Sequence, residues 1–325
     1  MKLKEFKNSK LNPTVFLFKI TSRCNDFCKF CIEYEFIKAK RPDLFLSEIK
    51  NNYSYLRKKF EPDYVILTGG EPTLHPQFFE ILDFLKKQGA AFRIITNLLK
   101  FNEKDFLKRL KPFFSRFKNK KQEQLTRVIV SINDLPGCHP SALKRIQGLR
   151  NALKCNLPLM ITVLIYQNNV RDLPAIASLL TETFKKFAPS RILYVEFRFI
   201  YIEGTPKNLL EDSVPKNFYD IISSLEKAID ILESFGAKIT LWNFPVCYLN
   251  KPERIKNANI GSKLERRFIK INKDLQLQNV AVRDWKKYLK PYKKCRVCKF
   301  NNVCSGVDKN YFKKFGFPSI RPRKS

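Results

Sequence analysis

Hydrophobic residues along the chain form short apolar runs that alternate with longer stretches of helical periodicity. The short runs predict six strands, at residues 15–20, 63–67, 91–96, 127–132, 159–165 and 192–200. The periodic stretches predict helices at about residues 49–60, 76–88, 103–114, 140–154, 172–187 and 218–235. In one of them, Phe78, Ile81 and Leu85 recur on one face between Pro76, which suits a helix start, and Gly89, which suits a helix end. The chain therefore consists of repeated β-α units.

This alternation predicts an α/β fold with a parallel sheet and right-handed crossovers. Six units are too few for a closed eight-stranded barrel, so the pattern allows a doubly wound sheet or a partial barrel. In both architectures ligands gather at the carboxyl ends of the strands. The unusual polar residues follow that rule, because they stand directly after predicted strands: Cys24, Gly69, Gly70, Glu71, Asn97, Ser131, Asn133, Asp134, Asn168 and Asn169.

Length and composition indicate one large domain with an appendage, because 325 residues with 44% hydrophobic content can bury a sizeable core. No apolar stretch reaches the roughly 18–20 residues that a membrane helix needs. The basic N-terminus has no apolar segment followed by a small-residue cleavage site, so we expect no secretion signal and a cytoplasmic location. In that compartment nine cysteines favour metal ligands or free thiols over disulfides.

The charge balance is strongly basic, with 62 Lys and Arg against 30 Asp and Glu and a formal net charge of +32. Such a field attracts nucleic acid, anionic membrane surfaces or acidic peptides. A lysine-rich background spread over all solvated faces explains the same number without a dedicated patch. Net charge alone therefore leaves a polyanionic partner and a diffuse surface as equal alternatives.

Three cysteines lie within eight residues directly after the first predicted strand, at Cys24, Cys28 and Cys31. Soft thiolate ligands select iron–sulfur clusters, zinc or copper(I). A cubane cluster normally takes four thiolates, so three local ligands would leave one iron open. The alternative is three buried or zinc-binding cysteines.

The spacing Cys-x3-Cys-x2-Cys, with Phe30 just before the third cysteine, resembles the signature of the radical S-adenosylmethionine (radical SAM) superfamily. About forty residues later and one β-α unit on, Gly69-Gly70-Glu71-Pro72 looks like that family's segment for the methionine amino group of SAM. The two motifs occur in the family's order and at its separation. The resemblance implies an incomplete (β/α)6 barrel of the TIM type.

The same resemblance implies the roles of single residues. Cys24, Cys28 and Cys31 would hold a [4Fe–4S] cluster whose open iron binds the amino and carboxylate groups of SAM. Phe30 would contact the adenine, and Ser131 resembles the strand-four residue that reaches the ribose. Where the family ends that strand Ser-x-Asp, this chain has Asn133 and then Asp134, so either side chain could take the ribose. Further likenesses concern asparagines: Asn169, or else Asn168, after strand five, and Asn97 after strand three, although Leu98 replaces the family's glycine.

The implied reaction passes one electron to the sulfonium of SAM and forms a 5′-deoxyadenosyl radical, which abstracts hydrogen from a substrate at the barrel mouth. The cluster and SAM carry the chemistry, while the protein positions them and excludes water.

A second group of cysteines occupies the C-terminal region, at Cys247, Cys295, Cys298 and Cys304. The spacing resembles the auxiliary-cluster regions of radical SAM enzymes, called SPASM and twitch. Where the SPASM pattern has a further cysteine, this chain has Asp308, so we expect one auxiliary [4Fe–4S] cluster. A structural zinc knuckle is the alternative, because four cysteines would also satisfy it. Cys138 and Cys155 suit small apolar positions.

We therefore predict a radical SAM barrel over residues 10–235 and a small auxiliary-cluster domain over residues 236–325. A peptide or protein is the first expectation for the substrate, with a cellular one-electron donor as partner. RNA or a nucleotide-derived molecule is the alternative, favoured by the net charge. The rival from another class is a non-enzymatic zinc protein that binds nucleic acid.

Overall fold

The computed structural model describes residues 14–115, 117–200, 213–215, 218–242 and 244–250. It also describes shorter segments at 267–271, 278–281, 288–289, 293–300, 304, 306–308 and 311–313.

Seven parallel strands form the centre of the fold, and six of them are the strands that the sequence predicts. They are β1 (Thr14–Thr21), β2 (Tyr64–Gly69), β3 (Phe92–Thr96), β4 (Arg127–Ser131), β5 (Leu159–Ile165), β6 (Tyr194–Phe199) and β7 (Lys238–Trp242). Each strand pairs in parallel with the next in sequence, so the sheet order from β7 to β1 follows the chain without crossing. The sheet is an open, partial barrel, as expected. The seventh parallel strand was not predicted.

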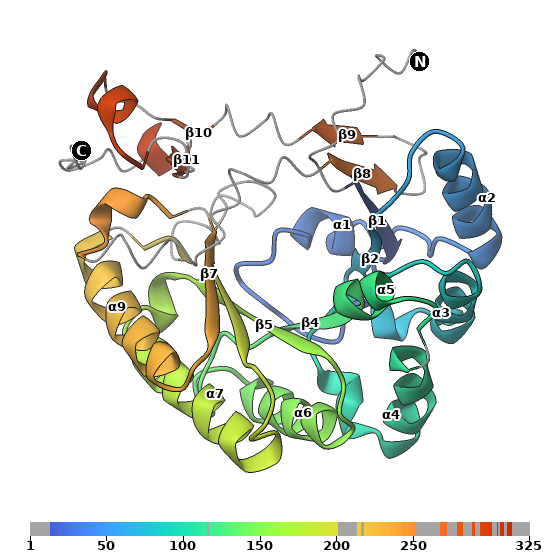
Figure 1. Ribbon diagram of the computed structural model, residues 1–325, viewed down its shortest axis with the longest axis horizontal. Helices are drawn as coiled ribbons and strands as arrows, with labels where there is room; N and C mark the ends of the chain where they lie inside the picture. Colours follow the sequence, from blue (N-terminus) through green and yellow to red (C-terminus); the bar gives the residue numbers. More distant parts are fainter. Residues whose placement is uncertain are drawn as a thin grey trace.

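Helices cover the outer face of this sheet, as Figure 1 shows. Those of the β-α units are α2 (Leu46–Arg57), α3 (Phe78–Lys87), α4 (Lys104–Leu110), α6 (Ala142–Lys154), α7 (Leu173–Phe187) and α9 (Phe218–Ser234), with short α1 (Tyr34–Lys38) and α5 (Lys120–Leu125) between them. The predicted stripe of α3 is buried: Phe78, Ile81 and Leu85 are each at most 2% exposed, and so is Leu82. Burial of such stripes against the strands supplies the main stabilisation of the barrel.

Two further strands extend the sheet beyond β1, on the side away from β2. β8 (Arg267–Ile271) runs parallel to β1, and β9 (Gln278–Ala281) runs antiparallel to β8. A small two-stranded sheet joins β10 (Tyr288–Leu289) to β11 (Val307–Asp308). Both β7 and β8 come from residues beyond 235, so the C-terminal part of the chain adds strands to both sides of the barrel sheet.

The C-terminal part of the chain also packs against the end of β6. The Tyr311 ring is 1% exposed, lies 5.5 Å from the Phe199 ring, and its hydroxyl donates a hydrogen bond to the Pro215 carbonyl at 2.7 Å. Cys247 and Cys304 pack against the same main core. The region that carries the second group of cysteines is thereby joined to the carboxyl end of the strands.

Candidate metal and cofactor site

The cysteine loop begins at the end of β1, where three polar residues fix its course. Thr21 Oγ1 donates a hydrogen bond to Asp43 Oδ1 at 2.6 Å and accepts one from the Arg23 amide at 3.0 Å. Ser22 Oγ donates to the Arg41 carbonyl at 2.6 Å. These bonds join the start of the loop to the segment that leads into α2. Both ends of the loop region are therefore held together at the carboxyl edge of the sheet.

Residues along the loop alternate between its two sides. Cys24, Asp26 and Cys28 are partly or wholly turned inward, whereas Arg23, Asn25, Phe27 and Lys29 are exposed. A period of two is that of an extended segment, in which successive side chains point to opposite sides. The first two thiols therefore face the barrel from one side of the loop.

The three thiols are held in an environment that disfavours their ionised form. Burial raises the pKa of Cys24 to about 11 and that of Cys31 to about 12, and the neighbouring thiols add to both shifts. Thiols must lose their protons to bind a metal, and a bound cation compensates the cost of burying their charge. Within the described residues, no three metal-ligating side chains are close enough together to hold one metal ion. The fit to an iron–sulfur cluster rests on the donor type, because three soft thiols lie on one loop.

Arg145 on α6 is the main charged partner of this loop. Its side chain is 3% exposed, its Nη2 donates to Cys28 Sγ at 3.2 Å, and its Nε donates to Asp26 Oδ2 at 2.9 Å. Asp26 also accepts from Ser141 Oγ at 3.0 Å. Burial raises the pKa of Cys28, and the guanidinium of Arg145 opposes that shift. Arg145 therefore favours the thiolate form of the second cysteine.

The Gly69-Gly70-Glu71 segment lies against the start of the cysteine loop. The Gly70 amide donates to the Thr21 carbonyl at 2.8 Å, and the Glu71 amide donates to the Arg23 carbonyl at 2.7 Å. A Cβ on Gly69 would stand 2.2 Å from the Thr21 oxygen, and one on Gly70 would stand 2.2 Å from the Arg23 oxygen. The two glycines are thus required by the close approach of one backbone to another.

The Glu71 carboxylate binds the protein itself. It is 1% exposed and accepts hydrogen bonds from Thr73 N at 3.1 Å, Thr73 Oγ1 at 2.7 Å, Thr96 Oγ1 at 2.9 Å and Asn97 N at 2.7 Å. Pro72 starts the buried 3-10 turn that presents Thr73. Glu71 therefore fixes the ends of β2 and β3 to each other. The Asn97 side chain donates from Nδ2 to Asn25 Oδ1 in the cysteine loop at 2.9 Å.

Leu98 takes the left-handed backbone conformation, with φ of 68°. This is the conformation for which the family pattern places a glycine. A leucine is sterically strained in this conformation. The Leu98 side chain is fully buried. The turn after β3 therefore forms with leucine in the place of the family's glycine, because burial of the Leu98 side chain offsets the strain.

We expect from this packing that Gly70→Ala destabilises the protein by about 3 kcal/mol. The added Cβ meets a backbone oxygen, which cannot rotate away. Thermal unfolding followed by circular dichroism measures the effect. Gly137→Ala is the matched control: it also adds a Cβ, which there meets nothing within 4 Å, and only its φ of 90° costs about 1 kcal/mol. Equal losses in the two variants would contradict the close approach.

The ends of β4 and β5 form another side of the candidate site. Asn133 Oδ1 accepts from the Leu164 amide at 2.8 Å, and Asn169 Nδ2 donates to the Asn133 carbonyl at 2.8 Å. Asn169 also bonds the Leu164 carbonyl at 2.7 Å and the Tyr166 amide at 3.0 Å. Both asparagine side chains are thus occupied in tying the strand ends together. Of the other predicted residues here, Ser131 ends β4 half-exposed and Asn168 is exposed.

Asp134 and Tyr166 form a buried pair beside the cysteine loop. The Tyr166 hydroxyl donates to Asp134 Oδ1, and Asp134 Oδ2 is buried without a hydrogen-bond partner. The Phe30 ring lies 4.5 Å from the Tyr166 ring. The structure therefore brings the predicted Phe30 together with an aromatic ring and a half-satisfied carboxylate. A buried polar atom without a partner suits a ligand that donates a hydrogen bond.

Three residues of the site were not predicted from the sequence: Asp26, Arg145 and Tyr166. One signal for Arg145 was present, because it lies on the apolar stripe of α6 with Ala142, Ile146 and Leu149. A charged residue on a buried helix face needs a partner. Nothing local indicates that the partner is Asp26, which is 119 positions away.

The other three C-terminal cysteines are near enough to Cys247 to affect its ionisation, although 57 positions separate the first from the last. Burial, with smaller contributions from the thiols of Cys304, Cys295 and Cys298, raises the pKa of Cys247 to about 12. The Cys298 amide donates to the Cys295 carbonyl at 3.3 Å, and the Gly306 amide donates to Cys304 Sγ at 3.3 Å. Cys155 packs against the core and Cys138 is exposed.

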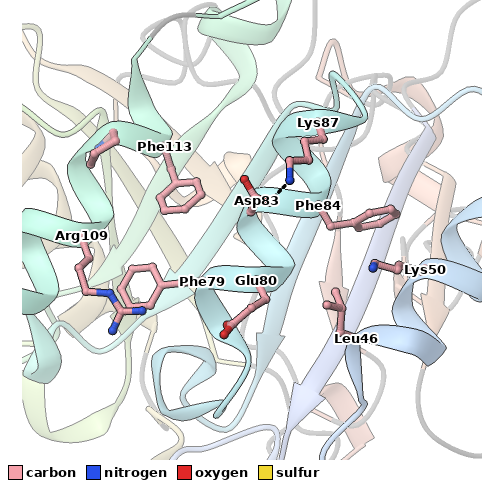
Figure 2. A pocket seen from close by; sticks show the side chains of 10 residues that line it. Leu46, Lys50, Phe79, Glu80, Asp83, Phe84, Lys87, Arg109 and Phe113 are labelled. Carbon is pink, nitrogen blue, oxygen red and sulfur yellow. Dashed lines mark ion pairs between the residues drawn. The ribbon is translucent and has the colours of Figure 1, made fainter.

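A pocket of about 680 Å³ lies away from these groups, on the outer surface of α3 (Figure 2). Aromatic rings line it, and cations cover two of them: Arg109 stands 4.0 Å from the Phe79 centroid and Lys50 stands 5.9 Å from that of Phe84. Lys87 and Asp83 form an ion pair between the rings. None of the predicted site residues lines this pocket, so it is not part of the cysteine site.

Comparison with known proteins identifies the class. The family described as the radical SAM superfamily matches residues 18–180, half of the chain. The chain belongs to this superfamily, and it is an enzyme. A family of this kind implies a [4Fe–4S] cluster and SAM as cofactors.

Curated relatives match over parts of their length. The chain is 35% identical over 78 residues to an S-adenosylmethionine-dependent nucleotide dehydratase of Selenomonas ruminantium, covering 24% of this chain and 27% of that protein. It is 25% identical over 182 residues to an Fe-coproporphyrin III synthase of Methanosarcina barkeri, covering 54% of this chain and 42% of that one. The chain therefore spans less than half the length of these two relatives.

Solved structures share the fold. Native anSMEcpe with bound AdoMet aligns with a TM-score of 0.63 at 14% identity, over 95% of this chain and 92% of that one. Streptococcus suis SuiB bound to S-adenosylmethionine aligns with a TM-score of 0.60 at 14% identity, over 93% of this chain and 75% of that one. The described helices include none that is long and apolar enough to span a bilayer.

Proposed function

We propose that this enzyme binds a [4Fe–4S] cluster through Cys24, Cys28 and Cys31 and cleaves SAM reductively. The observation that carries the proposal is the loop of three half-buried thiols at the carboxyl edge of the sheet, with Arg145 in contact with Cys28 Sγ. When bound, the cluster and SAM supply the electron and the 5′-deoxyadenosyl radical that abstracts hydrogen from the substrate.

The protein's own residues hold this site in shape. Arg145 stabilises the Cys28 thiolate and keeps Asp26 inside the loop. Glu71 ties the ends of β2 and β3 to each other, so that the segment from Gly69 to Pro72 is held ready for the methionine end of SAM. Phe30 and Tyr166 would offer an apolar wall for the adenine, and Ser131, at the end of β4, would bind the ribose.

For the ribose we assign the acceptor role to Asp134 and not to Asn133. Asn133 Oδ1 is occupied by the Leu164 amide, whereas Asp134 Oδ2 is buried and has no partner. A hydroxyl group would satisfy this oxygen.

We expect Asp134→Asn to weaken SAM binding about tenfold, because a charge-assisted hydrogen bond is lost. Equilibrium dialysis of labelled SAM with the anaerobically reconstituted protein measures the affinity. Asp105→Asn removes an exposed carboxylate on α4 and should leave the affinity unchanged. Unaltered binding in Asp134→Asn would show that this carboxylate does not face the ligand.

A peptide or protein is the substrate that we propose. The support is the shared fold of two neighbours whose structures contain peptides: SuiB bound to the precursor peptide SuiA, and anSMEcpe with bound AdoMet and Cp18Cys peptide. RNA or a nucleotide-derived molecule is the second candidate. It is favoured by the net charge of +32 and by similarity to the nucleotide dehydratase.

The proposal also includes an auxiliary-cluster region within residues 236–325, whose first strand, β7, extends the barrel of residues 10–235. Cys247, Cys295, Cys298 and Cys304 would hold one auxiliary [4Fe–4S] cluster, and the support is that the other three thiols contribute to the electrostatics of Cys247. A zinc ion would suit the same ligands. We place the enzyme in the cytoplasm, where thiols stay reduced.

The test is anaerobic reconstitution followed by metal analysis and spectroscopy. One cube requires about four irons and two cubes about eight. Paramagnetic resonance of the reduced protein should change when SAM is added, and 5′-deoxyadenosine should form. Colourless protein with stoichiometric zinc and no response to SAM would overturn the proposal in favour of a zinc protein.

A further inference from the structure

The pocket over α3 contains none of the residues that the proposed function uses (Figure 2). Its volume of about 680 Å³ lies within the range of ligand sites, roughly 300–1,000 Å³. Phe79 and Phe84 on α3 line it, together with Phe113 from the 3-10 turn Lys111–Phe114 that follows α4. All three side chains are half-buried, so each presents part of its ring to solvent. The pocket therefore offers an aromatic surface on the outside of the barrel.

Cations stand at both flanks of this aromatic surface. Arg109 of α4 lies over the Phe79 ring on one side, and Lys50 of α2 lies over the Phe84 ring on the other, as Figure 2 shows. Both cationic side chains are exposed, and neither has a carboxylate partner within the part of the chain that the structure describes. Each flank thus combines a ring with a positive charge that no carboxylate neutralises there.

The edge of the pocket near the carboxyl end of α3 is basic as well. Lys86 Nζ donates a hydrogen bond to the Ser115 carbonyl at 3.0 Å, and Lys118 Nζ donates one to the Lys87 carbonyl at 3.2 Å. Carbonyl partners hold these ammonium groups in place without cancelling their charge. The carboxylate of Asp83 is paired with Lys87 at 2.7 Å. Anionic groups of a ligand would therefore be attracted to this edge and to both flanks.

One carboxylate between the two flanks has a different character. Glu80 is exposed on α3 between Phe79 and Phe84, and it has no ion pair with any described residue. A carboxylate repels phosphate but accepts hydrogen bonds from amino groups such as that of cytosine. The pocket therefore suits a ligand that has flat apolar faces, anionic groups at its edges and amino groups between them.

We infer that single-stranded nucleic acid binds in this pocket, which we name the α3 groove and define by Lys50, Phe79, Glu80, Phe84, Arg109 and Phe113. Phosphates of the strand lie against the cations, base faces lie against the rings, and Glu80 accepts a hydrogen bond from the amino group of a base. Aromatic rings interleaved with cations suit single strands, because every base has a flat face and every linkage has a charge. The net charge of +32 favours the encounter.

This inference does not depend on the proposed function. The α3 groove lies on the outer surface of α3, away from the cysteine loop, so a strand bound there is docked and is not presented to the thiols. Iron content and 5′-deoxyadenosine formation should therefore be the same in the wild type and in every variant of the groove. Loss of strand binding would leave the cluster and SAM cleavage as they are.

The test is fluorescence anisotropy of labelled oligocytidylate of about twelve nucleotides with the reconstituted full-length protein. We expect Lys50→Glu combined with Arg109→Glu to weaken binding about tenfold. The matched control is Lys154→Glu combined with Lys186→Glu, because both lysines are exposed and lie over the Phe187 ring at 5.2 and 5.7 Å. It changes the net charge equally and should weaken binding about twofold at most. Equal losses in the two double variants would overturn the inference.

The Glu80 carboxylate allows a second measurement. Cytosine carries an amino group and uracil does not, so the wild type should bind oligocytidylate about tenfold more tightly than oligouridylate. Glu80→Met keeps the length of the side chain and removes the acceptor, so it should reduce this preference to about twofold. An unchanged preference would overturn the inference. Binding of an RNA duplex, cytidine monophosphate or polyglutamate as tight as that of the strand would also overturn it, in favour of that ligand.

Discussion

Cys28→Ala is expected to reduce SAM cleavage below detection while the barrel stays folded. Cys28 is the central thiol of the loop, and its loss leaves two local ligands and an Arg145 guanidinium without its sulfur contact. Two thiolates cannot hold a cube that exposes one open iron, so the site fails as a whole. The measurement is 5′-deoxyadenosine formation after anaerobic reconstitution, with circular dichroism to confirm the fold.

Cys138→Ala is the matched control, because Cys138 is an exposed thiol outside both cysteine groups. It should retain wild-type cleavage and iron content. If Cys28→Ala still formed 5′-deoxyadenosine at a rate close to that of Cys138→Ala, the ligand assignment would be wrong.

Replacing Arg145 by methionine is expected to cost about 3–5 kcal/mol of stability, because it leaves Asp26 as a buried carboxylate without its cation. The Asp26 and Arg145 side chains are 4% and 3% exposed, so water cannot take over the lost contact. The Cys28 thiol would also lose the guanidinium that favours its ionised form, and metal loading should fall. Chemical denaturation measures the stability, and iron content measures the loading.

A double variant separates charge from packing. Asp26→Asn combined with Arg145→Met removes both charges, so it should be more stable than Arg145→Met alone. Asparagine keeps an acceptor for the Ser141 hydroxyl. A double variant that loses the sum of the two single effects would show that the buried ion pair is not the origin of the loss.

The parts of the fold that follow from local pattern were predicted. Six strands and the loop of three cysteines were found because periodicity and spacing are properties of neighbouring residues. β7 was missed, because Lys238–Trp242 falls within residues 236–325, which were interpreted as the auxiliary-cluster domain and not as part of the barrel. β8 pairs with β1 across about 250 positions, and no local signal encodes that pairing.

At the candidate site, the residues that belong to the site were easier to predict than the contacts that they make. The glycines of Gly69-Gly70 stood out, but their physical reason is the Thr21 and Arg23 carbonyls against which they lie. Glu71 stood out as well, and the structure shows its carboxylate occupied by Thr73, Thr96 and Asn97. Such partners are set by the folded strand ends, so a single sequence does not reveal them.

The pairing of β8 with β1 has a consequence for synthesis of the protein. The strand that leads into the cysteine loop acquires its second neighbour only from residues 267–271. At about 5–20 residues per second on the ribosome, β1 keeps one unpaired edge for tens of seconds after it emerges. A nascent chain in that state exposes a strand edge to other chains. Premature termination before residue 267 would make that edge permanent, so truncated products are expected to aggregate.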